Sequence, residues 1–393
     1  MHTIGVFFGS RSPEHDISIL TAMLVISNLY NVNYNVVPIY ITREGEWLTR
    51  RDFDTVSTFE DMDSLNANTC TTLILDLHKS KGKMVLKENK TFGKEIVIDV
   101  AFPCFHGLNG EDGTIQGWFE LLNMPYVGCD VASSSVAMNK VLTKRIMVSG
   151  GIPTPKFVEF SKFNYENYRE QALSEIKESL QLPVFVKPPH LGSSIGISMV
   201  KNWDELESNI DLALYYDNQV LIEEGVSNMM DVTCCVIGND DTIASQLQAS
   251  NYSDGFFSYE DKYLNNGGAQ TGEDRQNLII PAPLSDKITN YITATAKEVY
   301  RVLGCSGIAR IDFLVNKETN QFYVNEVNTL PGTIYSHLWK ESGIPTRELV
   351  VKLIGYALDK YKAKQEINTI FVSNVITNVN SIKLGNKLSG GGN

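Results

Sequence analysis

The stretch that decides the fold is "GIARIDFLVNKETNQFYVNEVNTLPG", residues 307–332. Its two apolar runs flank the polar turn "NKETNQ", a pattern that predicts a β-hairpin over 306–328. Because side chains two residues apart on a strand point to the same face, Arg310 and Asp312 share one face of the first strand. Glu326 and Asn328 share a face of the second strand for the same reason.

These four side chains form a candidate metal and phosphate site. Carboxylate and amide oxygens on neighbouring strands suit Mg²⁺ or Mn²⁺ shared with a phosphate, so Asp312, Glu326 and Asn328 are candidate ligands. Arg310 beside them would neutralise charge on a phosphoryl group. The alternative is a surface hairpin with cross-strand ion pairs and no bound metal.

A second candidate is the glycine loop in "VFVKPPHLGSSIG", residues 184–196. A strand ends at Lys187, and Gly192, Ser193 and Ser194 follow, small residues that let backbone N–H groups approach phosphate oxygens. The P-loop pattern GxxxxGK[ST] is absent, and no GxGxxG follows the first strand, which disfavours a dinucleotide site. An ordinary turn after a strand is the alternative.

Two further segments carry candidate residues. In "HGLNGEDGTIQG", residues 106–117, His106 precedes acidic residues at the head of a helix, which a strand-to-helix connection explains equally well. "FFSYEDKYL", residues 256–264, lies in a long polar stretch typical of a lid. Lys262 and Tyr263 would reach a site when such a lid closes, and a flexible excursion without a role is the alternative.

Alternating strand and helix patterns along the chain predict an α/β fold with a parallel sheet covered by helices. Strands are expected at 3–8, 35–42 and, as one strand, 95–105. Helices are expected from the N-cap Ser12 onward and, further along, over the following ranges: 114–122, 138–151, 203–216, 285–303 and 346–362. The polar, glycine-rich tail is expected to be disordered.

Composition bounds the class of protein. The 393 residues suit two or three packed units, and 43% hydrophobic with 20% charged residues is typical of a globular protein. The net charge of −12 argues against general nucleic-acid binding. Six cysteines without a CxxC pair disfavour zinc and indicate reduced thiols in the cytoplasm. We expect neither a signal peptide nor a membrane span, since no apolar run approaches ~20 residues.

Together these segments resemble the D-alanine–D-alanine ligase family of the ATP-grasp enzymes. "HGLNGEDGTIQG" is similar to its N-terminal signature and the hairpin stretch to its C-terminal signature, while "VKPPHLGSSIG", "SYEDKYL" and "FGSRSPEHDIS" are similar to its glycine loop, ω-loop and first loop. The resemblance covers residues 1 to about 362. It implies a Rossmann-like preATP-grasp domain over 1–137, two α+β subdomains over 138–226 and 227–362 that clasp ATP, and a C-terminal extension over 363–393.

The resemblance also implies roles for single residues. Glu14 would hold the ammonium of the first amino acid, Ser193 would couple it to Tyr263, and His106 would lie near the first substrate. Arg310 and Gly332 would face the developing oxyanion. Two Mg²⁺ or Mn²⁺ ions would sit on Asp312, Glu326 and Asn328. ATP would contact the following side chains: Lys140, Lys187, Ser193, Ser194, Glu223, Glu224, Asp231 and Lys262.

The implied reaction joins two D-alanines through an acyl phosphate made from ATP, for peptidoglycan precursors, by a cytoplasmic homodimer. The run "TIYSHLW" after Pro331 departs from the family pattern, in which a serine binds the carboxylate of the second substrate. Tyr335 falls at that serine's place and Ser336 follows it. A related ligase with another amino acid or amine as second substrate is therefore an alternative, as is a regulatory protein that binds nucleotide without catalysis.

Overall fold

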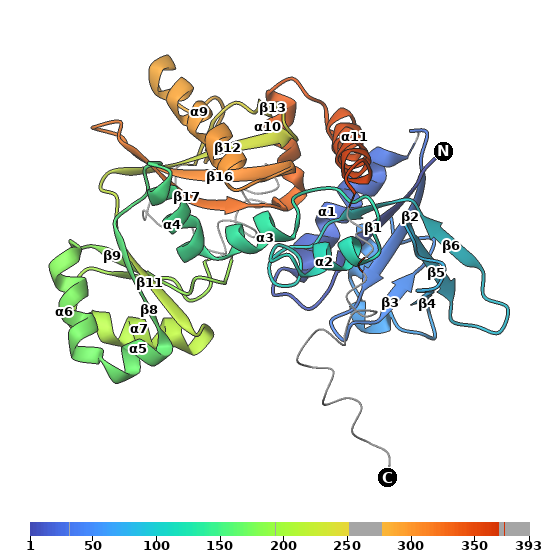
Figure 1. The fold of residues 1–393 in the computed structure, drawn as a ribbon, viewed down its shortest axis with the longest axis horizontal. Helices are drawn as coiled ribbons and strands as arrows, with labels where there is room; N and C mark the ends of the chain where they lie inside the picture. Colours follow the sequence, from blue (N-terminus) through green and yellow to red (C-terminus); the bar gives the residue numbers. More distant parts are fainter. Residues whose placement is uncertain (31, 193, 251–276, 369–372, 374–393) are drawn as a thin grey trace, which may run out of the picture.

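The computed structural model describes residues 1–30, 32–192, 194–250, 277–368 and 373. Three β-sheets follow one another along the chain, each with its own helices (Figure 1). The expected α/β class is confirmed. The expected boundaries after residues 137, 226 and 362 stay predictions.

The first sheet has the strand order β6-β5-β4-β3-β2-β1-β7. Its parallel part is the expected one, with β1 (Thr3–Gly9) between β2 (Asn35–Ile41) and β7 (Val100–Pro103). The antiparallel part was not foreseen and consists of β3 (Trp47–Thr49), β4 (Thr71–Leu75), β5 (Met84–Glu88) and β6 (Glu95–Ile98). Helices α1 (His15–Leu29) and α11 (Thr346–Gln365) share a core with one face of β1, and α2 (Thr114–Leu121) packs on the other.

Two local predictions in this domain are wrong. The single strand expected over 95–105 is broken at Asp99, whose backbone N–H and carboxylate both hydrogen-bond the backbone of Thr3. As a result, β6 and β7 are the two edge strands at opposite ends of the first sheet. Ser12 is not an N-cap, because its hydroxyl donates to the carbonyl of His106 at 2.7 Å and the helix begins only at His15, with Glu14 as its N-cap.

The second sheet belongs to a small α+β unit and has the order β10-β9-β11-β8. Its strands are β8 (Phe157–Ser161), β9 (Val184–Lys187), β10 (Ser198–Val200) and β11 (Gln219–Glu224). Helices α5 (Lys162–Asn167), α6 (Arg169–Ser179) and α7 (Leu206–Tyr216) pack beside them. Helices α3 (Val131–Met138) and α4 (Lys140–Ser149) lead from the first sheet to this unit (Figure 1).

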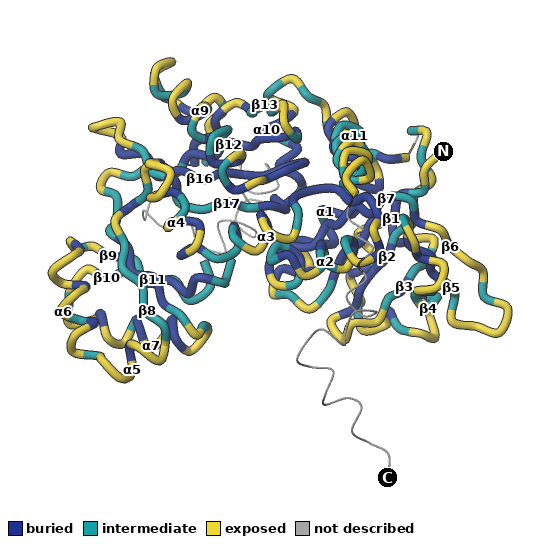
Figure 2. The backbone as a smooth tube through the Cα atoms, in the orientation of Figure 1, coloured by how far each residue is buried: buried dark blue, intermediate teal, exposed yellow. Residues whose placement is uncertain are grey.

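The third sheet contains the predicted hairpin, formed by β16 (Gly307–Asn316) and β17 (Phe322–Asn328). The remaining strands are β12 (Met229–Gly238), β13 (Thr242–Ala244), β14 (Gln248–Ser250) and β15 (Leu278–Ile279). Helix α9 (Asp286–Val302) covers one face, where Ile311 and Phe313 are fully buried in its core. Arg310 and Asp312 therefore take the opposite face, as strand alternation requires. Buried segments run through all three sheets, and the exposed residues lie mainly on the outer helices and loops (Figure 2).

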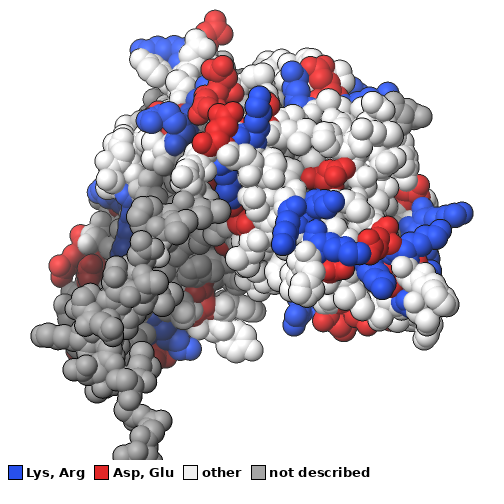
Figure 3. Space-filling view, turned by 45° about the vertical axis from the view of Figure 1, so that its right-hand side comes forward, with Lys and Arg blue, Asp and Glu red and all other residues white. Residues whose placement is uncertain are grey.

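A short turn and helix follow the hairpin. Residues Gly332–Tyr335 form a 3₁₀ turn, η6, and α10 (Ser336–Glu341) continues from it into the core shared with α1 and α11. In the described ranges no helix is long and apolar enough to cross a membrane. On the face in Figure 3, lysine and arginine side chains lie interspersed with acidic ones.

Candidate active site

An open cavity of about 870 Å³, measured out to its solvent-exposed mouth, lies between the second and third sheets. Strands β9 and β11 form one wall, and β12, β16 and β17 form the other. Ten of the residues singled out in the sequence line this cavity: Lys140, Lys187, Gly192, Ser194, Glu223, Asp231, Arg310, Asp312, Glu326 and Tyr335.

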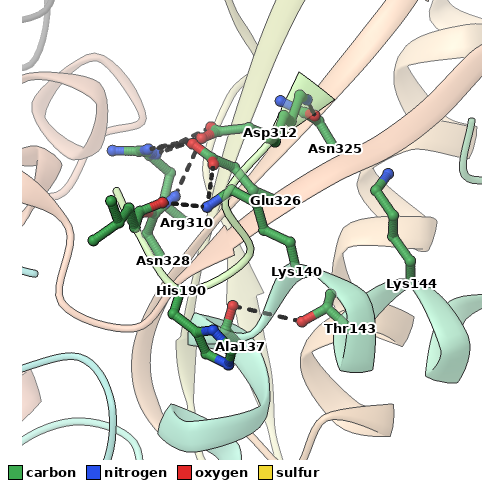
Figure 4. Close-up of polar contacts among 12 residues, drawn as sticks. Ala137, Lys140, Thr143, Lys144, His190, Arg310, Asp312, Asn325, Glu326 and Asn328 are labelled. Carbon is green, nitrogen blue, oxygen red and sulfur yellow. Dashed lines mark hydrogen bonds and ion pairs between the residues drawn. The ribbon is translucent and has the colours of Figure 1, made fainter. Parts of the chain in front are cut away.

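The hairpin places its polar residues in direct opposition. The strand register pairs Arg310 with Asn328 and Asp312 with Glu326. Arg310 donates from Nε and Nη2 to Asp312 Oδ2 at 2.9 and 2.7 Å, and Asn328 Nδ2 donates to the same oxygen at 3.3 Å (Figure 4). Glu326 lies 3.7 Å from Arg310 Nη2 and 3.8 Å from Lys140 Nζ.

This cluster is strongly ionic, with a buried arginine between partly exposed carboxylates. Arg310 is 4% exposed, and although burial alone would lower its pKa, the neighbouring Asp312 carboxylate raises it well above the usual range. Two cations thus face the two carboxylates. Within the residues that the structure describes, no three His, Cys, Asp or Glu side chains form a metal-binding group, so a third oxygen would come from Asn328. That set of hard oxygen donors fits Mg²⁺ or Mn²⁺.

Two lysines line the cavity, and a third, which was missed in the sequence, lies behind its wall. Lys140 Nζ donates to the carbonyl of Leu191 at 2.7 Å, which ties helix α4 to the glycine loop. Lys187 hydrogen-bonds Glu223 Oε1, and Lys144 lies 2.7 Å from the other oxygen of the same carboxylate. Lys144 follows Lys140 by four residues on the predicted helix, so the shared helix face would have revealed it.

Glu223 is ionised although its side chain is only 1% exposed. Burial alone would raise the pKa of this carboxylate, but Lys144 and Lys187 outweigh it and lower the pKa to about 2. The neighbouring Glu224 points elsewhere, since its Oε1 accepts from the backbone N–H of Gln181 at 2.9 Å. Glu224 does not line the cavity.

Glu14 lies where three loops meet. Gly107 has a φ of +68°, which favours glycine, and a Cβ atom there would come within 2.4 Å of Glu14 Oε2. A Cβ atom at Gly192 in the glycine loop would lie 3.5 Å from the same oxygen. The structure thus brings together the first loop, the "HGLNG" turn and the glycine loop, which are far apart in the sequence.

His106 connects the first domain to the turn after the hairpin. Its Nδ1–H donates to the carbonyl of Leu330 at 2.8 Å, which leaves Nε2 to accept from the Thr21 hydroxyl at 2.7 Å. The backbone N–H of Thr333 donates to that same hydroxyl at 2.9 Å. His106 is 3% exposed and does not line the cavity, so in this structure it holds the Pro331–Gly332 turn in place.

The segment from Gly332 to His337, called the turn segment below, has an unusual backbone. Thr333, Ile334 and Tyr335 all have φ of 49°, in the left-handed region. Tyr335 is 3% exposed, and its ring lies 5.1 Å from the Arg310 guanidinium and 4.8 Å from the His337 ring. His337 Nε2 donates to Gln248 Oε1 at 2.7 Å.

The remaining predicted residues are placed as follows. Gly332 is buried at the start of η6, and Ser336 is buried at the start of α10. Ser193, Lys262 and Tyr263 lie outside the described residues. The individual roles assigned to all site residues stay predictions.

Comparison with known proteins agrees with this geometry. Residues 3–129 match the family model "D-ala D-ala ligase N-terminus", and residues 146–355 match "D-ala D-ala ligase C-terminus". A D-alanine–D-alanine ligase of Caldicellulosiruptor bescii is 40% identical over 370 residues, covering 93% of this chain and 97% of the relative. The same-named protein of Thermosipho melanesiensis is 37% identical, with 98% and 100% covered.

Solved structures give the same result. The VanG D-Ala:D-Ser ligase from Enterococcus faecalis superimposes with a TM-score of 0.78 at 32% identity, over 91% of this chain and 99% of that one. The D-alanine–D-alanine ligase from Coxiella burnetii has a TM-score of 0.77 at 28% identity, over 93% and 96%. The fold is therefore ATP-grasp, and the chain belongs to the D-alanine–D-alanine ligase family.

Proposed function

We propose that this protein is an ATP-dependent D-alanine–D-alanine ligase that makes the dipeptide for peptidoglycan precursors. The observation that carries the proposal is the convergence of Arg310, Asp312 and Glu326 with Lys140 and Lys187 on one cavity. Cations that alternate with carboxylates around a cavity suit a nucleotide whose phosphates are neutralised from two sides. The names of the relatives supply the substrate.

The chemistry begins with an activation step. A carboxylate is a poor acyl donor because its leaving group would be oxide. A carboxylate oxygen of the first D-alanine attacks the γ-phosphorus of ATP, the bond to the bridging oxygen breaks, and ADP leaves. Lys140 and Lys187 hold phosphate oxygens in line for this transfer, so catalysis is mainly positioning and charge stabilisation.

The second step forms the peptide bond. The free amine of the second D-alanine attacks the carbonyl carbon of the acyl phosphate, loses a proton, and inorganic phosphate departs. Arg310 and the backbone N–H of Gly332 stabilise the oxyanion of the tetrahedral intermediate. Within the described residues Arg310 Nη1 makes no hydrogen bond, so a donor remains for that oxygen.

We propose that Asp312, Glu326 and Asn328 hold two Mg²⁺ or Mn²⁺ ions. The strand register sets Asp312 opposite Glu326, with Asn328 two residues further on the same strand, and this cluster of hard oxygen donors supports the proposal. Bound metal supplies charge neutralisation on the transferred phosphoryl group.

The substrate and nucleotide contacts complete the proposal. Glu14 holds the ammonium of the first D-alanine, near His106, and Ser193 couples it to Tyr263. The backbone at Glu223 and Glu224, together with Asp231, meets the nucleoside, and Ser194 and Lys262 meet phosphates. We further propose a homodimer in the cytoplasm, which light scattering tests by giving twice the mass of one chain.

The second substrate is the open part of the proposal. Tyr335 and Ser336 stand where the family pattern has a carboxylate-binding serine, and Tyr335 lines the cavity with a large buried ring. One of the similar solved structures is a D-Ala:D-Ser ligase, so a ligase with a different second amino acid is the alternative.

The test is ATP-dependent phosphate release with D-alanine alone, followed by mass spectrometry of the product. The proposal predicts D-alanyl-D-alanine and no turnover with L-alanine alone. Turnover with a mixed pair of amino acids, but not with D-alanine alone, would contradict the proposed second substrate and favour the alternative ligase.

A further inference from the structure

One buried carboxylate in the cavity wall is shared by two ammonium groups. Glu223, on β11, has Lys187 at Oε1 and Lys144 at Oε2, the latter at 2.7 Å. The side chains of Glu223 and Lys144 are 1% and 2% exposed, so this contact is shielded from water. Lys187 is 10% exposed and lines the cavity, whereas Lys144 does not line it.

The two lysines differ in how firmly they are held. Lys144 Nζ forms an ion pair with Glu223 Oε2 and donates its hydrogen bond to the Thr154 hydroxyl at 3.0 Å, and that hydroxyl donates to the carbonyl of Val324 on β17 at 3.1 Å. This chain of bonds anchors Lys144 to the third sheet. Figure 4 shows Lys144 rising from helix α4 beside Lys140. Lys187 has instead a second, weaker acceptor at the cavity, Asn325 Oδ1 at 3.4 Å.

The charges of Glu223, Lys144 and Lys187 determine whether Lys187 can bind a phosphate. Two ammonium groups and one carboxylate leave one positive charge available to a bound anion. A buried carboxylate that loses its last cation is strongly destabilised. Lys187 is therefore free to turn toward a phosphate only while Lys144 keeps the charge of Glu223 compensated.

We propose that Lys144 is a positioning residue for nucleotide binding, which acts by holding Glu223 so that Lys187 is released to the phosphates. The inference rests on the proposed function, since it takes ATP as the ligand of Lys187. Without Lys144, Lys187 is the remaining counter-charge of Glu223 and stays on that carboxylate. Lys144 itself touches no substrate.

The test is a double-mutant cycle read out as affinity for MgATP and MgADP by calorimetry. Lys144→Met removes the ammonium but keeps an unbranched chain, and its nucleotide affinity is expected to fall about tenfold or more. In Lys144→Met combined with Glu223→Gln, no buried charge needs Lys187, so most of that affinity returns. Lys144→Arg keeps the charge and is expected to lose less than Lys144→Met. The KM for D-alanine stays within about twofold in all variants that fold.

Controls separate this effect from damage to the fold. Lys177→Met changes an exposed lysine on α6 and is expected to bind nucleotide as the unmodified protein does. Thermal unfolding of every variant shows whether it is folded at the assay temperature. If Lys144→Met alone does not fold, Glu223→Gln is compared with the double variant. The proposal predicts equal nucleotide affinity for these two, because Lys144 then has no carboxylate to hold.

Three results would overturn the inference. Unchanged nucleotide affinity in folded Lys144→Met removes its basis. If Lys144→Met and the double variant lose the same nucleotide affinity, Lys144 acts only through packing. The same conclusion follows if the double variant binds nucleotide more weakly than Glu223→Gln. If the unmodified protein binds neither MgATP nor MgADP, the proposed function fails first, which is a different outcome from these.

Discussion

The β16–β17 hairpin and the turn segment, Gly332–His337, lie next to each other but take their shapes in different ways. The hairpin is regular, and its register alone sets Asp312 opposite Glu326. The turn segment contains three consecutive residues with φ of 49°, a conformation that non-glycine residues seldom adopt. Burial of Ile334 and Tyr335 in the core shared with α1 and α11 holds it there.

The difference teaches where the family resemblance is informative. In the hairpin, the sequence alone predicts a charged face, because side chains two residues apart on a strand point to the same side of the sheet. In the turn segment, the position of Tyr335 depends on contacts with α1 and α11, which are distant in sequence. We therefore propose that the chemistry shared by the family lies on the hairpin, and that the choice of second substrate depends on the turn segment.

Glu326→Gln tests the hairpin and has the largest expected effect. Loss of one oxygen charge at the proposed metal site is expected to lower kcat about 10³-fold. Phosphate release with saturating D-alanine measures it. Glu318→Gln, an exposed change in the turn of the same hairpin, is the matched control and is expected to be normal. Near-normal activity of Glu326→Gln would remove the metal-ligand role.

His337 makes the turn segment sensitive to acid. Burial, and then the charge of Arg310, lower its pKa to about 4. The unfolded chain binds a proton near pH 6.5, so the free energy of unfolding falls as pH drops from 6.5 toward 4. Between pH 7 and 5 this amounts to about 2 kcal/mol.

Urea unfolding at both pH values tests this account of His337. In His337→Gln the pH dependence of the unfolding free energy is expected to shrink by that amount, whereas exposed His78→Gln leaves it unchanged. The same acid sensitivity in His337→Gln as in the unmodified protein would assign the effect to other groups.

Tyr335→Leu tests the contact between the two regions. The Tyr335 ring over the buried Arg310 guanidinium contributes up to about 2 kcal/mol, so the variant is expected to lose about tenfold or more in kcat/KM. Tyr335→Phe keeps the ring and is expected to stay within about threefold, within the range of weak hydrogen-bond effects. An equal loss in both variants would show that the hydroxyl contacts substrate, and that the ring does not act through Arg310.

The smallest expected effect concerns backbone strain. A left-handed conformation costs a residue with a Cβ roughly 1–2 kcal/mol, so Thr333→Gly is expected to be about 1 kcal/mol more stable than Thr333→Ala. Asn320, in the hairpin turn, has φ of 58°, and asparagine tolerates this region. Asn320→Gly should therefore differ little from Asn320→Ala. Denaturant unfolding of the four variants measures both differences, and equal differences would show no special strain in the turn segment.

Much of this molecule follows from local pattern, and the rest depends on partners distant in the chain. The hairpin, the glycine loop and most long helices were predictable because apolar periodicity and glycine spacing are local. The strand break at Asp99 could not be predicted, because it depends on hydrogen bonds to Thr3. The start of helix α1 at His15 could not be predicted either, because Ser12 bonds to His106 instead of capping the helix. The helical spacing from Lys140 would have pointed to Lys144, but its pairing with Glu223 could not be predicted locally, because Glu223 lies 79 residues away on another element.

The central claim is that an acyl phosphate forms from D-alanine and ATP in this cavity, and isotope transfer tests it most directly. D-alanine labelled with ¹⁸O in both carboxylate oxygens is supplied with unlabelled ATP, and the released phosphate is analysed by mass spectrometry. The account predicts one ¹⁸O atom in each phosphate, together with D-alanyl-D-alanine. Dipeptide accompanied by unlabelled phosphate would contradict it.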